Sequence, residues 1–128
     1  PEVLFFQGSR VSHHTVAEDF RPLAERMLQD LESLAADKIT YHNPSRTAIR
    51  LDRTSLADYL DAAPISPPLR ELVRVAYITE MGLDIEAQSC LNLLFLIGTE
   101  VGGWSPYGIS DERYHVIGGN DRIPRALA

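Results

Sequence analysis

Basic residues, cysteines and long apolar runs are all scarce in this 128-residue chain. Its 12 lysines and arginines are outnumbered by 18 aspartates and glutamates. The resulting net charge of −6 argues against nucleic acid or an anionic membrane as partner, because both attract basic surfaces. Cys90 is the single cysteine, so no intrachain disulfide can form and cysteine pairing does not identify the compartment. The longest nearly unbroken apolar run, residues 91–98, is too short to cross a bilayer. We expect a soluble protein and favour the cytoplasm.

What the chain does contain is the composition of one globular domain with a modest core, because 45% of its residues are hydrophobic and 23% are charged. Residues 2–9 look like an engineered protease-recognition linker. We therefore expect residues 1–10 to be an expression linker and residues 11–128 to be a single helical domain.

Capping signals and apolar periodicity predict four helices. In the first, Thr15 and Glu18 have the spacing of a capping box. Pro22 either kinks this helix or marks its true first turn. Its apolar positions recur every three or four residues and are Val16, Phe20, Leu23, Met27, Leu31 and Leu34. The second helix is expected from Ser55 to about residue 62, and the third from Ser66 to a stop at Gly82.

The fourth helix is expected to begin at Asp84 and to end at Gly102-Gly103. It carries apolar residues on nearly every face between positions 91 and 97, so we expect it to be the most buried element. A short strand or hairpin is expected near residues 39–51 and another near 113–117. The predicted class is therefore mainly α.

A last helix is expected to begin near Ile123, capped by Asn120 or Asp121. The chain stops only about one turn later, and so short a helix is marginal in water by itself. We therefore expect the sequence to be a segment of a longer protein.

No self-sufficient catalytic motif is present in the sequence. It lacks a G-x-G-x-x-G fingerprint, a phosphate loop, a paired-cysteine motif and a G-x-S-x-G elbow. The four histidines lack a helical ligand spacing, so no metal site is predicted. Cys90 lies in an apolar stretch and is expected to be a small core residue. The double glycines at 102–103 and 118–119 are expected to be turns or helix stops.

Two features leave a site open. Glu80 lies close to the predicted C-terminus of a helix, where a carboxylate is electrostatically disfavoured, so it is solvated, paired with a cation or part of a site. Trp104, Tyr107 and Tyr114 cluster in a loop-like region, where aromatic residues either pack beneath the loop or line a ligand cavity.

The sequence resembles the helical substrate domain of flavin-dependent amine oxidases over residues 15–128. The likeness is carried most closely by residues 110–128, which read SDERYHVIGGNDRIPRALA. In that family, this segment returns from the substrate domain toward the flavin-binding core. Further matches are residues 51–56 with Tyr59-Leu60, residues 69–77 with Glu80-Met81-Gly82, and residues 91–94. The spacing of Asp121, Pro124 and Ala126 is closer to the L-amino-acid oxidases of the family.

The resemblance implies a parent enzyme that binds FAD and oxidises a small amine or amino acid to an imine, with release of ammonia and hydrogen peroxide. It implies a segment of an α+β flavoenzyme, with the rest of the flavin-binding polypeptide as its partner. Because the flavin fingerprint is absent from this chain, we expect it to bind no FAD and to be inactive alone. Register on the family pattern places these candidates along the substrate cavity: Tyr77, Glu80, Met81, Ile97, Trp104, Tyr107, Ile109 and Asp111.

Two alternative functions are compatible with the sequence. The chain could be a small all-α interaction domain, which forms a homo-oligomer or binds a partner helix through exposed apolar helix faces around residues 93–97. It could also be a processed subunit that assembles with separately cleaved flavin-binding chains.

Overall fold

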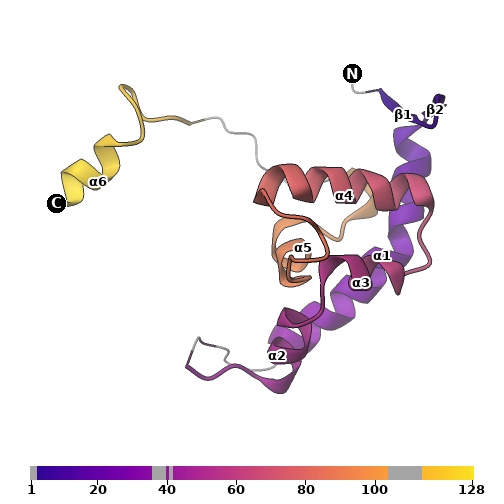
Figure 1. Cartoon of the computed structure of the whole chain (residues 1–128), viewed down its shortest axis with the longest axis horizontal. Helices are drawn as coiled ribbons and strands as arrows, with labels where there is room; N and C mark the ends of the chain where they lie inside the picture. Colours follow the sequence, from indigo (N-terminus) through magenta and orange to yellow (C-terminus); the bar gives the residue numbers. More distant parts are fainter. Residues whose placement is uncertain (1–2, 36–39, 41, 104–113) are drawn as a thin grey trace.

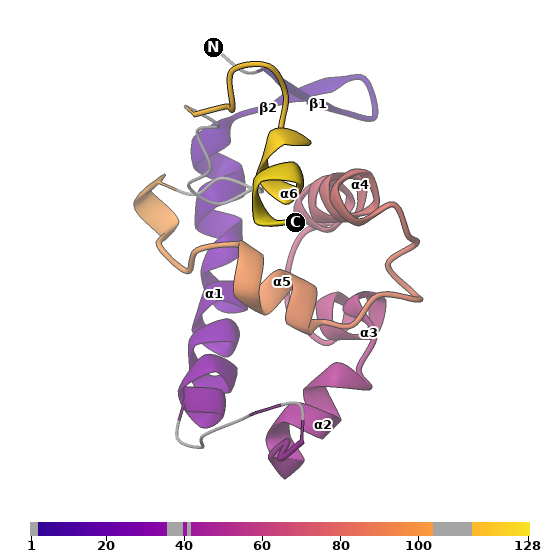
Figure 2. The same cartoon turned by 90° about the vertical axis from the view of Figure 1, so that its left-hand side faces the viewer.

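The computed structural model describes residues 3–35, 40, 42–103 and 114–128 and shows a mainly helical fold with one small hairpin (Figures 1 and 2). The mainly α class is therefore confirmed. In the described ranges, no helix combines the length and apolar character needed to span a bilayer. The elements in chain order are β1 (Leu4–Phe6), β2 (Ser9–Val11), α1 (His13–Ala35), α2 (Arg46–Asp52), α3 (Leu56–Asp61), α4 (Pro67–Met81), α5 (Leu91–Leu96), a short 3-10 helix η1 (Val101–Gly103) and α6 (Arg122–Leu127).

The long helix α1 begins earlier than its capping box predicted. The hydroxyl of Ser12 accepts a hydrogen bond from the amide of Thr15 at 3.0 Å, so Ser12 takes the capping position expected of Thr15. The helix runs through Pro22 without a break. Its buried residues are Val16, Phe20, Leu23, Ala24, Met27 and Leu34, which confirms most of the predicted stripe.

Serine hydroxyls also cap the next three helices. The side chains of Ser45, Ser55 and Ser66 accept from the amides three residues later, at 3.1, 3.0 and 3.4 Å. Helix α4 ends at Gly82, whose φ of 65° lies in the left-handed region that glycine adopts without a steric cost. The predicted starts of α3 and α4 and the stop of α4 are confirmed.

The strands predicted near residues 39–51 and 113–117 are wrong wherever the structure describes those ranges. Residues 46–52 form α2, because Ser45 supplies a helix cap, and only an isolated bridge joins Thr40 to Asn43. Residues 114–117 form no strand. In the described part of the chain, the strands are β1 and β2, which pair antiparallel and, except for Val11, lie in the predicted linker.

The fourth predicted helix is shorter than expected and is not buried on all faces. Asp84 starts no helix, because backbone groups in residues 85–90 bond to the start of α3 instead. The amides of Leu56 and Ala57 donate to Gln88 and Ile85 at 2.9 and 3.1 Å, and the amide of Cys90 donates to Thr54 at 2.9 Å. Helix α5 therefore covers only Leu91–Leu96, and Phe95 on it is 70% exposed.

The core lies among α1, α3, α4 and α5, and its largest fully buried side chains include Phe20, Tyr59 and Tyr77. Cys90 is fully buried, as expected of a core residue, and its thiol donates to the carbonyl of Leu51 at 3.1 Å. The predicted last helix is present as α6. It has no buried residue and lies away from the other helices in Figure 1.

Candidate functional site

The described candidates for the substrate cavity divide between the core and the surface. Tyr77 and Ile97 are buried, whereas Glu80 and Met81 lie exposed at the end of α4. The four remaining candidates lie outside the described residues and are Trp104, Tyr107, Ile109 and Asp111. The described part of the chain therefore does not bring the predicted residues together around one cavity.

Tyr77 is the most unusual of these candidates. Its ring and hydroxyl are fully buried, yet the hydroxyl has no hydrogen-bond partner among the described residues. Burial raises the pKa of Tyr77 well above its usual value, and the charge of Glu80 adds to this shift. The backbone carbonyl of Tyr77 accepts from Nε2 of the buried Gln88 at 3.1 Å, which fixes this end of α4.

A polar network that the sequence did not predict joins α1, α2 and α3. The carboxylate of Asp30 accepts from the Tyr59 hydroxyl at 2.9 Å and from the Arg50 guanidinium at 3.0 Å. Arg26 donates to the Tyr59 carbonyl at 3.0 Å and lies 4.0 Å from the centroid of its ring. Burial, followed by the bond to Asp30, raises the pKa of Tyr59. The polar groups of this network bond to one another and thereby hold three helices together. We therefore interpret the network as structural.

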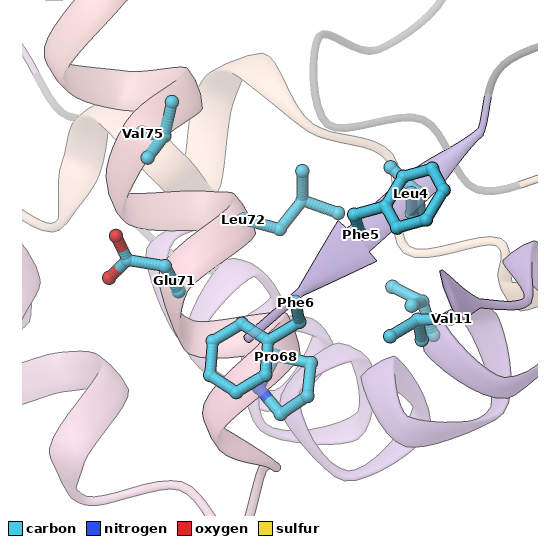
Figure 3. A pocket seen from close by; sticks show the side chains of 9 residues that line it. Leu4, Phe5, Phe6, Val11, Pro68, Glu71, Leu72 and Val75 are labelled. Atoms are coloured by element: carbon cyan, nitrogen blue, oxygen red, sulfur yellow. The ribbon is translucent and has the colours of Figure 1, made fainter. Parts of the chain in front are cut away.

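The hairpin, α1 and α4 line a small, half-open apolar pocket, shown in Figure 3. Its volume is about 220 Å³. The Phe6 ring lies beside Pro68, and Leu72 points from α4 toward the hairpin. The residues that line the pocket are Leu4, Phe5, Phe6, Val11, Val16, Pro68, Glu71, Leu72 and Val75.

Sequence reasoning missed this pocket because it excluded residues 1–10. Gln7-Gly8 lies between two three-residue segments that contain apolar side chains, residues 4–6 and 9–11. A two-residue connection that ends in glycine is a hairpin signal. Gln7 and Gly8 have φ values of 48° and 78°, as the tight turn requires. Leu4 and Val11 pack against the core. That residues 1–10 are an expression linker stays a prediction.

The described residues show neither the parallel strands of a dinucleotide fold nor a group of possible metal ligands. Dinucleotide folds hold their ligand at the ends of parallel strands, whereas the described residues form one antiparallel hairpin. The turn at Gly118-Gly119 is confirmed and is closed by the bond from the Gly119 amide to the Val116 carbonyl at 2.9 Å. Across the described ranges, no three His, Cys, Asp or Glu side chains are grouped as metal ligands would be.

No family model, curated protein or solved structure matches this chain. The function of the chain must therefore be inferred from its own residues. Those that the structure describes offer apolar surfaces for binding: the hairpin pocket, the exposed side chain of Phe95 on α5 and the exposed C-terminal segment.

Proposed function

We propose that this chain is the helical substrate-domain segment of a flavin-dependent amine or L-amino-acid oxidase and is inactive by itself. The proposal is supported by the sequence resemblance, by the mainly helical fold, and by the surface that the C-terminal residues leave uncovered. In this proposal, the parent enzyme carries out oxidative deamination, and the flavin that another segment holds supplies the redox chemistry. The present chain supplies part of the cavity wall.

The observation that carries the proposal is the exposure of residues 114–128, which we call the C-terminal arm. Tyr114, Ile117 and Leu127 are 89%, 83% and 83% exposed, although their side chains are large and apolar. Ile123 and Leu127 lie four residues apart, so they share one face of α6. Ile123 and Leu127 thus leave an apolar helix face in water, which favours a surface that packs against something else. The resemblance places the return to the flavin-binding core in this same arm.

Tyr77 gives the proposal a second, weaker support. A buried hydroxyl normally has a hydrogen-bond partner, because burying it alone costs about 1–3 kcal/mol. The Tyr77 hydroxyl has none among the described residues, and it lies on the helix where the resemblance places cavity residues.

Complementation tests the proposal. The purified chain should show no flavin absorption near 450 nm and no peroxide production from amines or amino acids. Co-expression with the coding regions that flank it should give a yellow complex with oxidase activity. Bound flavin and turnover in the chain alone would overturn the proposal, and so would flanking regions that encode no strand followed by G-x-G-x-x-G.

Variants of the C-terminal arm make this test specific. Ile123→Asp and Leu127→Asp should abolish complementation, because each places a charge on the α6 face that is proposed to be covered. Leu28→Asp is the matched control, because Leu28 is an apolar residue on α1 with a similar exposure. Leu28 is 44% exposed and Ile123 is 52% exposed. If the control fails as badly as the arm variants, the arm is not the contact surface.

The processed-subunit alternative differs from the main proposal only in how the chain arises. Mixing the separately purified chain with flavin-binding chains should then restore activity without co-expression. Recovery only on co-expression would count against assembly from processed subunits.

The interaction-domain alternative has one observation in its favour, the exposed Phe95. Leu93, Leu94 and Ile97, which were expected to meet a partner helix, are buried within the chain. A homo-oligomer through α5 would therefore depend on Phe95. Light scattering that shows a clean monomer would count against it, whereas a dimer that Phe95→Ser dissociates would support it.

A further inference from the structure

Helix α4 has two apolar faces, of which only one belongs to the core. Leu69, Val73, Ala76 and Tyr77 are buried against the other helices. A neighbouring face of α4 carries residues that are three, one and three positions apart, which are Pro68, Glu71, Leu72 and Val75. The hairpin lies over this second face, and the pocket is the space left between them (Figure 3).

The walls of this hairpin pocket are apolar, with Glu71 the one ionisable side chain among its lining residues. The Glu71 carboxylate is already engaged, because Arg74 binds both of its oxygens at 2.6 and 2.8 Å. This pairing lowers the pKa of Glu71. A charged ligand would therefore find no free counter-charge on the pocket walls, which favours an uncharged one.

The size of the pocket sets the size of its occupant. At about 220 Å³, it is larger than an apolar cavity of about 150 Å³ that holds benzene. At its rim, Phe5 is 70% exposed and Val75 is 48% exposed, so apolar surface remains in contact with water there. A flat apolar ring would cover this surface and gain its burial.

We propose that the hairpin pocket binds a small uncharged aromatic molecule of one or two rings, in the range from benzene to indole. This site is separate from the proposed substrate cavity, because it uses a different face of α4 from Tyr77. In this proposal the hairpin forms one wall of a binding site in the folded domain. This contrasts with the expectation that residues 1–10 are only a linker.

Titration of the full chain with indole, followed by methyl NMR, tests the proposal. The methyl groups of Leu4, Val11, Leu72 and Val75 should shift together and saturate along one binding curve. The methyl group of Ala128 and those of Leu28 should not shift. Shifts that do not saturate, or that spread equally over all exposed apolar residues, would overturn the proposal.

Two variants and one ligand analogue sharpen the test. Val75→Asp should weaken indole binding at least tenfold, because it places a charge at the rim, while the exposed control Leu28→Asp should bind as the unmodified chain does. Phe6→Ala removes a wall and should have the same effect as Val75→Asp, provided that the remaining methyl spectrum stays dispersed. Indole-3-acetate should bind at least tenfold more weakly than indole. Equal affinity for the charged analogue, or unchanged binding by Val75→Asp, would overturn the proposal.

Discussion

Two fully buried tyrosines, Tyr59 and Tyr77, should respond in opposite directions when their hydroxyls are removed. Both side chains are 0% exposed and both belong to the core. The Tyr59 hydroxyl donates to Asp30 at 2.9 Å, whereas the Tyr77 hydroxyl has no partner among the described residues. Substitution by phenylalanine removes one oxygen from each site and leaves the ring in place, so the pair isolates the contribution of the hydrogen bond.

The expected magnitudes follow from these surroundings. Tyr59→Phe loses a hydrogen bond to a carboxylate and should lower the free energy of unfolding by about 1.5–3 kcal/mol. Tyr77→Phe removes a buried, unsatisfied hydroxyl and should raise the free energy of unfolding by about 1 kcal/mol. The two variants should therefore differ by roughly 3 kcal/mol, which is about the difference of those two estimates.

Urea denaturation followed by circular dichroism measures both values. The dependence on urea should keep the same slope in the two variants, so that the change in midpoint reports stability alone. A loss of 1 kcal/mol or more in Tyr77→Phe would refute the reasoning, because it would mean that the hydroxyl is bonded in the folded chain. An unchanged Tyr59→Phe would refute the assigned role of its bond to Asp30.

Three further outcomes are expected. Burial raises the pKa of Cys90 to about 11, so iodoacetamide at pH 8 should alkylate it at least about 100-fold more slowly in the folded chain than in urea, and equal rates would contradict its burial. Gly82→Ala should cost about 1–2 kcal/mol in thermal denaturation, because the φ of 65° disfavours a side chain, whereas Gly98→Ala should cost less than half as much. Stability should fall as the pH rises above about 9, because the folded chain retains protons on Cys90, Tyr59 and Tyr77 that the unfolded chain releases; a flat profile between pH 8 and 11 in urea titrations would contradict this.

The helices that could be predicted from the sequence are those with local signals at their ends. Ser55 and Ser66 cap α3 and α4, and Gly82 ends α4, so nearest neighbours in the sequence determine these boundaries. Helix α2 was missed although Ser45 caps it in the same way. Residues 47–51 were expected to form a brief strand or an extended connection, and in a seven-residue element periodicity alone does not separate a helix from a strand.

The errors in the rest of the fold have long-range causes. Asp84 has the residue type of a helix cap, but residues 85–90 form hydrogen bonds with residues 54–57. The sequence of residues 85–90 contains no local signal for that pairing. The hairpin is a different case. Residues 1–10 look like a protease-recognition linker, and a linker is not expected to form strands.

The candidate site was predictable only as a helix, and not as a cavity. The family resemblance placed both Tyr77 and Glu80 along the cavity. A separation of three residues on a helix rotates them enough for one to be buried and the other exposed. Which of the two faces the core depends on where α1 and α5 pack. The Asp30–Tyr59 bond likewise joins residues 29 positions apart and has no local signature.

The bonds between residues 85–90 and residues 54–57 also limit how the length of this chain can vary. Connections between helices usually accept insertions, because their backbone groups face water. Here the amides of Leu56, Ala57 and Cys90 are matched to fixed carbonyl partners across the two segments. One inserted residue between positions 85 and 90 would break that matching and displace the buried side chains of Ile85 and Gln88. We infer that this irregular segment tolerates insertion as poorly as the interior of a helix.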